Sequence, residues 1–114
     1  MNKYIAEFIG TFFLVLTIGC TGIGAGAGVI APLAIGMTVM TGAFAVGDIS
    51  GGAFNPAVAL GICILGISSW GNIWIYLLAN FAAAIVAAVV FQLINPPMQT
   101  TPIATDEPPY QTPR

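Results

Sequence analysis

Charged side chains are almost absent from this sequence. Only 5% of its 114 residues are Asp, Glu, Lys or Arg, and histidine does not occur, whereas roughly 25% of a typical soluble domain is charged. With two basic residues in all, the chain has no basic patch that could neutralise the phosphates of a nucleic acid. The 58% content of hydrophobic residues instead indicates a multi-pass integral membrane protein, which we expect in a plasma or inner membrane.

The side chains that enzymes and metal sites require are scarce as well. Cys20 and Cys63 are the only cysteines, and both stand among apolar residues without a metal-ligand spacing. We interpret them as small buried hydrophobic residues. The sequence shows no acid and base pair, no nucleophile beside a base and no phosphate-binding loop. We therefore expect neither an enzyme nor a cofactor.

Three long apolar stretches predict three membrane-spanning helices. We expect them at about residues 4–20, 29–47 and 70–94. Between the first two, residues 21–28 alternate glycine with small residues, which predicts a flexible, non-helical crossing. The first stretch could be mistaken for a signal peptide, but Glu7 lies within it, where the core of a signal peptide should be apolar.

A fourth, shorter helix is predicted after a pair of glycines. Asn55 is a preferred N-cap residue, and Pro56 suits the first turn of a helix, where its missing N–H is not needed. The helix would cover about residues 56–66, a length of roughly 16 Å or about half of a ~30 Å hydrocarbon core. Non-helical backbone at membrane depth is tolerated only inside protein or beside a polar cavity. This stretch therefore predicts a pore or a binding site.

Glu7 is an ionisable residue that we place within a span. Because a charge at membrane depth is costly, we expect its side chain to face the protein interior. We favour the interpretation that it accepts hydrogen bonds from backbone amides of the loop before the half-helix, over a role in proton transport. Asp48 is expected near the membrane interface as a solvated charge, and Trp70 and Trp74 as part of an interfacial aromatic belt.

Small residues mark one face of the third span. Ala79, Ala83 and Ala87 recur every four residues, so another helix can approach closely there. Asn80 in the same span is expected to form a hydrogen bond between helices. Residues 95–114 hold six of the eight prolines and three of the six charges, which predicts a disordered tail after a folded unit at residues 1–94.

Two motifs resemble the aquaporin and glycerol-facilitator family. They are Ala-Glu-Phe-Ile-Gly-Thr-Phe at residues 6–12 and Ile-Ser-Gly-Gly-Ala-Phe-Asn-Pro-Ala-Val at residues 49–58. The resemblance covers about residues 4–94 and implies a channel of two inverted repeats, whose Asn-Pro-Ala turns meet at the midplane. Each repeat has three spanning helices and one half-helix, and this chain contains one repeat. We therefore expect an all-α membrane protein with half of an aquaporin-like fold.

The resemblance also implies roles for individual residues. Asn55 would donate its side-chain amide to a solute in the pore. Pro56 and Ala57 would hold two half-helices together, and Glu7 would brace the loop. The N-termini of half-helices carry partial positive charge and would repel cations and protons while neutral solutes pass.

The residues that match the family's selectivity filter are small or aliphatic. They are Ile35, Ala43, Gly52 and Val58. In many members the second repeat carries an arginine three residues after its asparagine, and the corresponding position here is Val58. The resemblance thus implies a wide apolar mouth, which suits glycerol-like or other small neutral solutes as well as water.

Three functions remain open from the sequence. The favoured one is a passive channel for water or small neutral solutes, formed by two antiparallel copies of the chain and, by resemblance, clustered as four such pairs. The alternative is a non-conducting structural subunit, or a split half that needs a separate partner. Ion-driven transport through Glu7 or Asp48 is the weakest, because neither carboxylate has a visible cationic partner in the membrane.

Overall fold

A computed structural model describes residues 1–24 and 28–96 of the chain. The tail predicted for residues 95–114 therefore lies outside the described residues, apart from Asn95 and Pro96. Helices make up nearly all of the described chain, and no strand occurs within it. The elements in order are α1 (Asn2–Ile18), the π-helix η1 (Gly19–Gly24), the 3-10 helix η2 (Gly28–Ile30), α2 (Ala31–Ser50), α3 (Pro56–Ile64), the 3-10 helix η3 (Trp70–Asn72) and α4 (Ile73–Ile94).

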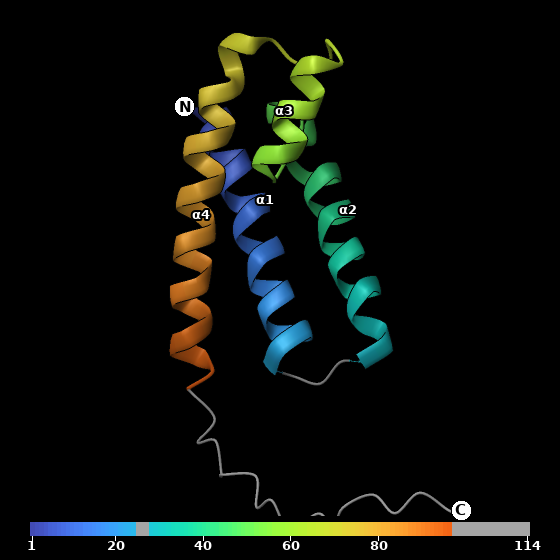
Figure 1. The fold of residues 1–114 in the computed structure, drawn as a ribbon, viewed down its shortest axis with the longest axis vertical. Helices are drawn as coiled ribbons and strands as arrows, with labels where there is room; N and C mark the ends of the chain where they lie inside the picture. Colours follow the sequence, from blue (N-terminus) through green and yellow to red (C-terminus); the bar gives the residue numbers. More distant parts are fainter. Residues whose placement is uncertain (25–27, 97–114) are drawn as a thin grey trace, which may run out of the picture.

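Three helical segments are long and apolar enough to cross a membrane. They are Asn2–Gly22, Gly28–Ser50 and Trp70–Ile94. They run side by side, with α1 between α2 and α4 (Figure 1). The first described residue and the end of α4 lie at opposite ends of this bundle (Figure 1). The expected all-α membrane fold, with three spanning helices and one half-helix, is confirmed.

The half-helix α3 is reached by a reversal of the chain after α2. Gly51 caps α2 with a left-handed φ of 97°, which suits glycine because no Cβ opposes that conformation. The chain then doubles back and enters α3, which runs to the end of the bundle where α4 begins (Figure 1). Its nine residues make a helix roughly 14 Å long, too short to span a membrane.

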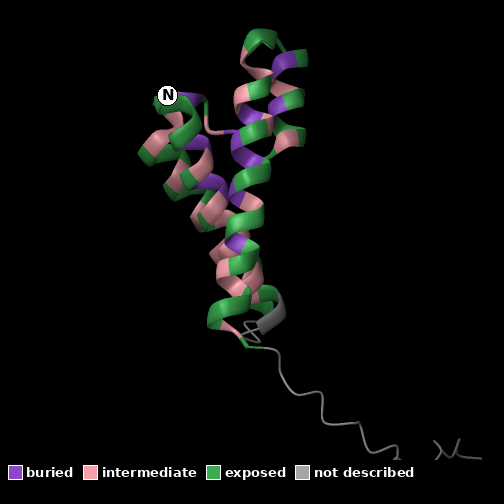
Figure 2. Ribbon diagram, turned by 90° about the vertical axis from the view of Figure 1, so that its left-hand side faces the viewer, coloured by how far each residue is buried: buried purple, intermediate pink, exposed green. Residues whose placement is uncertain are grey.

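Small residues allow α1 and α4 to pack closely. Ala83 and Ala87 of α4 are completely buried, and Ala6 of α1 is 2% exposed. The buried residues form an inner seam, while the outer faces of the helices are mostly exposed (Figure 2). Because lipid tails are as apolar as the side chains, close van der Waals packing of this kind is what holds helices together in a membrane.

The first helix extends beyond the point where the sequence predicted it to end. Residues Gly19–Gly24 form π-helix η1, so the prediction of a non-helical crossing is wrong for residues 21–24, while residues 25–27 lie outside the described chain. Within this segment Thr21 Oγ1 donates a hydrogen bond of 2.6 Å to the carbonyl oxygen of Thr17, one turn earlier. Bonds of this kind often bend a helix.

Candidate functional site

Asn55 caps the half-helix α3. Its backbone is extended, with φ −158° and ψ 128°, and its Oδ1 accepts a hydrogen bond of 2.8 Å from the amide of Ala57. Pro56 occupies the first helical position, as the sequence predicted. Since Oδ1 is engaged in the cap, Nδ2 is the part of this exposed side chain that is left to donate a hydrogen bond outward.

The carboxylate of Glu7 holds the loop in front of α3. Its Oε1 accepts hydrogen bonds from the Ala53 amide at 2.9 Å and from Ser50 Oγ at 2.7 Å, and its Oε2 accepts one from the Phe54 amide at 2.8 Å. Glu7 is completely buried, so these bonds form in a medium of low polarity, where bonds to a charged acceptor are strong. The side chain therefore fixes the backbone that leads into the N-terminus of α3.

Tyr76 of α4 fixes the same loop from the other side. Its Oη donates a hydrogen bond of 2.7 Å to the carbonyl oxygen of Ser50 and lies 3.1 Å from Ser68 Oγ. Ser50 Oγ in turn accepts a bond of 3.2 Å from the amide of Gly52. Residues of α1, α2 and α4 thus converge on the entry to the half-helix.

The ring of Phe54 packs between α1 and α2 and anchors the loop there. A Cβ added to Gly10 would lie 2.1 Å from the Phe54 ring, and one added to Gly42 would lie 2.9 Å from it, so each helix leaves room for the ring through a glycine. Phe54 itself has a φ of 48°, a conformation that costs a non-glycine residue on the order of 1–3 kcal/mol. Its ring is 2% exposed. Sequence reasoning did not identify Phe54, because glycines on two separate helices reveal a common notch only after folding.

A further hydrogen bond fixes α1 against α4. Thr11 Oγ1 donates to Asn80 Oδ1 at 2.8 Å, which confirms that Asn80 bonds between helices. Thr11 lies one turn after Glu7 and therefore on the same face of α1. This bond sets the register of the two helices that carry Glu7 and Tyr76.

The predicted filter residues are distributed over α2, the loop and α3. Ile35 is half-buried and Ala43 exposed, and the two lie about two turns or ~12 Å apart along α2. Gly52 lies in the loop with a φ of 64°, and Val58 is 47% exposed on α3. Ile35 and Ala43 therefore lie at different levels of α2.

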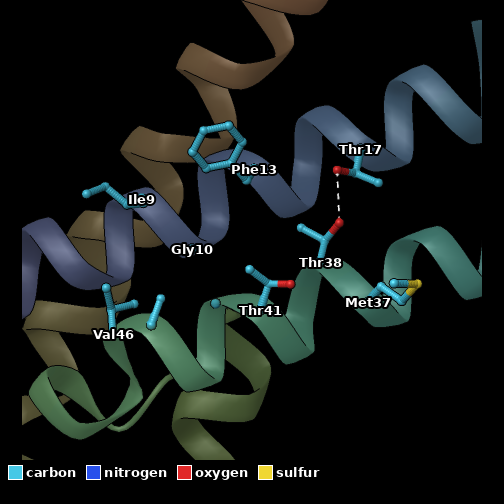
Figure 3. A pocket seen from close by; sticks show the side chains of 10 residues that line it. Ile9, Gly10, Phe13, Thr17, Met37, Thr38, Thr41 and Val46 are labelled. Carbon is cyan, nitrogen blue, oxygen red and sulfur yellow. Dashed lines mark hydrogen bonds between the residues drawn. The ribbon is translucent and has the colours of Figure 1, made fainter.

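An apolar groove separates α1 from α2. It has a volume of about 450 Å³ and contains none of the predicted filter residues (Figure 3). Thr17 and Thr38 face each other across it, with 3.2 Å between their Oγ1 atoms (Figure 3). Thr38 Oγ1 also lies 2.9 Å from the carbonyl oxygen of Ala34. The hydroxyls of Thr17 and Thr38 are thus engaged within the chain, and Thr41 adds a further hydroxyl to the otherwise apolar lining.

The chemical character of the site follows from the N-terminus of α3. The first amides of a helix carry partial positive charge, which favours hydrogen-bond acceptors and opposes cations. In the part of the chain that the structure describes, no group of three or more His, Cys, Asp or Glu residues could hold a metal ion. The site presents hydrogen-bond donors and apolar side chains.

Comparisons with known proteins agree with this geometry. The sequence model of the family described as "Major intrinsic protein" matches residues 1–91. The chain is 43% identical to Aquaporin Z of Brucella melitensis over 82% of this chain and 44% of that protein. It is 37% identical to Aquaporin TIP1-2 of Zea mays and 36% identical to Probable aquaporin TIP1-2 of Oryza sativa subsp. japonica, each over 82% of this chain and 38% of the relative.

The chain therefore spans less than half the length of these relatives. No solved structure gives a significant match. The family model covers both the helix that carries Glu7 and the loop and half-helix that carry Asn55. From this coverage and the geometry of the Asn-Pro-Ala turn, the chain is a multi-pass membrane protein that belongs to the major intrinsic protein family, the family of the aquaporins.

Proposed function

We propose that this chain forms, with a second copy of itself in the opposite orientation, a passive channel for water and small neutral solutes of the glycerol type. The observation that carries the proposal is the N-terminus of α3, capped by the exposed Asn55 and fixed by the buried Glu7. A half-length helix that ends in oriented donors at membrane depth is the arrangement from which membrane proteins build solute sites. The relatives named aquaporins support the same function.

The proposed pore chemistry is carried by the Asn-Pro-Ala turn. Asn55 Nδ2 would donate a hydrogen bond to a passing solute, while Oδ1 stays in the cap. The positive end of α3 would oppose cations and protons, and neutral molecules that accept a hydrogen bond would pass. Pro56 and Ala57 would contact the corresponding turn of the second copy, with Ala57 exposed and thus free to do so.

Pairing would satisfy groups that a single copy exposes. In one chain Asn55 and Val58 lie at the surface, so the donors at the start of α3 would face lipid. Each unsatisfied polar group in hydrocarbon costs several kcal/mol. A second copy related by an axis in the membrane plane would place another half-helix N-terminus opposite the first. By resemblance to the family, four such pairs would cluster together.

The proposed selectivity follows from small and aliphatic filter residues. Because Ile35 and Ala43 lie at different levels of α2, residues of both copies would line the mouth together. None of the four adds a charge or a donor side chain, so the mouth would admit glycerol-like solutes together with water. We place the channel in a plasma or inner membrane, with residues 1–94 as its folded unit.

Vesicle swelling and shrinkage test this function. The purified chain is reconstituted into lipid vesicles, and stopped-flow light scattering follows their volume after an osmotic step with and without an ion gradient. We expect water and glycerol permeability above that of empty vesicles and equal rates with and without the gradient. Flux that needs the ion gradient would overturn the passive channel. Flux that appears only after a separate family member is added would identify the chain as a split, partner-dependent subunit instead.

A further inference from the structure

A second pocket, whose lining contains none of the three Asn-Pro-Ala residues, opens at one end of the bundle. It has a volume of about 360 Å³ and lies where α1 and α4 begin and α2 and α3 end. Its polar lining includes Lys3, Asp48, Ser68, Ser69 and Asn72. The apolar groove between α1 and α2 differs from it, because no charged residue lines that groove.

Two charges of opposite sign line this pocket. Lys3, Glu7 and Asp48 are the Lys, Arg, Asp and Glu residues of the described chain. Glu7 is engaged by the loop before α3, whereas Lys3 and Asp48 are both exposed and border the pocket. A concave site with one ammonium group and one carboxylate suits a ligand that carries both an anionic and a cationic group.

Two serine hydroxyls of the pocket add one hydrogen-bond acceptor and one hydrogen-bond donor to these charges. Tyr76 Oη donates its single proton to the carbonyl oxygen of Ser50, so Ser68 Oγ is the donor in its 3.1 Å contact with Tyr76 Oη and keeps its lone pairs for another donor. Ser69 Oγ accepts a bond of 3.3 Å from the Gly71 amide and keeps its proton. The pocket thus offers acceptors at Asp48 and Ser68.

Donors for an anionic group come from other lining residues. The ammonium group of Lys3 and the hydroxyl of Ser69 both line the pocket. Two exposed tryptophans indicate the level of the pocket in the membrane. Trp70 directly follows the lining residue Ser69 and is 57% exposed, and Trp74, one turn later, is 66% exposed. Exposed tryptophans of membrane proteins concentrate at the headgroup level.

We propose that this pocket binds the headgroup of a zwitterionic phospholipid that has a phosphodiester and a primary ammonium group, as in phosphatidylethanolamine. The phosphodiester contacts Lys3 and Ser69. The ammonium group donates hydrogen bonds to Asp48 and Ser68. A trimethylated ammonium has no N–H to donate, and a glycerol headgroup has no positive charge, so phosphatidylcholine and phosphatidylglycerol each lose one half of the contacts. This site is independent of the proposed channel and of pairing between copies.

Native mass spectrometry of the purified full chain in detergent tests the proposal. Phosphatidylethanolamine, phosphatidylcholine and phosphatidylglycerol with identical acyl chains are titrated separately. We expect phosphatidylethanolamine to bind roughly tenfold more tightly than either other lipid, the effect of one charge-assisted hydrogen bond. Asp48→Asn should remove the preference over phosphatidylcholine. Lys3→Gln should weaken binding of all three lipids, because each carries the phosphodiester.

Two variants control for net charge. Asp106→Asn and Arg114→Gln change the charge by the same amounts as the pocket variants, but they lie in the sequence after α4, outside the described residues. Both should keep the full preference. Circular dichroism establishes that each variant is folded, and the lipid preference of the unmodified chain tests the proposal even where a variant fails to fold.

Three results would overturn the proposal. The first is equal affinity of the unmodified chain for the three lipids. The second is a preference over phosphatidylcholine that survives Asp48→Asn. The third comes from soluble glycerophosphoethanolamine, which carries the headgroup without acyl chains. We expect it to displace the lipid only at concentrations at least about a hundredfold above that of the lipid, because the acyl chains add apolar contacts. Displacement at equal concentration would identify a free phosphodiester, and not a membrane lipid, as the ligand.

Discussion

The ring of Phe54 occupies the space that Gly10 leaves free on α1. A Cβ at residue 10 would lie 2.1 Å from Cδ1 and Cε1 of Phe54, well inside van der Waals contact. Phe54 directly precedes the cap residue Asn55, and its φ of 48° aims the chain into α3. The position of the half-helix therefore depends on a missing methyl group at Gly10, and Gly42 leaves room on the other side of the ring.

The first prediction concerns this contact. Gly10→Ala should force the Phe54 ring out of its notch and destabilise the protein by about 1–3 kcal/mol, a typical cost of overpacking. Unfolding of the purified protein in detergent, followed by circular dichroism, measures the change. Gly36→Ala is the matched control, because residue 36 lies on helix α2 and nothing lies within 4 Å of its added Cβ. Equal stability of the two variants would contradict this packing of Phe54.

The second prediction concerns the brace at Glu7. Glu7→Gln keeps the size of the side chain but replaces one acceptor oxygen by an NH₂ group, which would face either the Phe54 amide or the Ala53 amide and Ser50 hydroxyl. At least one buried donor then loses its acceptor, at about 1–3 kcal/mol for each donor. Amide hydrogen exchange should accelerate at Ala53 and Phe54. The control is Glu107→Gln, which removes a carboxylate outside the described residues and should leave the exchange rates of Ala53 and Phe54 unchanged. If these rates are also unchanged in Glu7→Gln, Glu7 does not hold the loop.

The third prediction separates the cap from the proposed pore. Asn55→Asp keeps an oxygen that accepts from the Ala57 amide, so stability should change little. The new carboxylate would stand where neutral solutes pass, and water and glycerol flux in vesicles should fall sharply. Asn55→Ala is the converse variant, since it loses the cap at a cost of about 1 kcal/mol without adding charge. Undiminished flux through folded Asn55→Asp protein would argue against a pore at this motif.

Local sequence chemistry predicted the start of the half-helix and the hydrogen bonds that Glu7 accepts from its entry loop, both of which the structure confirms. It did not predict the contacts that Tyr76 and Phe54 add. Asn55 and Pro56 are adjacent signals whose effect is decided within one helical turn, and the structure contains the predicted cap. The bond from Tyr76 to Ser50 joins residues 26 positions apart, and the Phe54 notch needs glycines on two helices. Such contacts follow from the packing of the spans, and no local pattern encodes them.

The end of the first span and the filter show other limits of sequence reasoning. Glycine at residues 22 and 24 favoured a non-helical segment, yet the first span continues there as a π-helix in which Thr21 bonds to a carbonyl of the preceding turn. Tertiary context overrides weak helix propensity. The filter residues stay a prediction, because their meeting would require a second repeat that one chain does not supply.

The fourth prediction concerns the width of the proposed mouth. Val58→Arg adds bulk and hydrogen-bond donors at an exposed position of α3, so glycerol permeability should fall by a larger factor than water permeability. Leu60→Arg is the matched control, because Leu60 lies on the same helix and is likewise 47% exposed. Its side chain comes two residues after Val58 and therefore points about 200° away from it around the helix axis. Equal loss of both solutes in Val58→Arg, or the same pattern in Leu60→Arg, would exclude Val58 from the constriction.

The last prediction concerns assembly, and it follows from the number of spans. Three crossings place the start of α1 and the end of α4 on opposite sides of a membrane. Orientation is set mainly by Lys and Arg close to the ends of spans. Here Lys3 lies in the first turn of α1, and Arg114 lies about twenty residues after α4. The bias is therefore slight, and both orientations should be populated.

Three lysines inserted beside Lys3 should hold all copies in one orientation and abolish flux, because no antiparallel pair could form. Co-expression with a variant that carries three lysines directly after Asn95 should restore flux, since that variant would insert the opposite way. Cysteine labelling from each side of the membrane measures the two orientations directly. If every N-terminus of the unmodified chain labels from one side while flux persists, the pore cannot be an antiparallel pair.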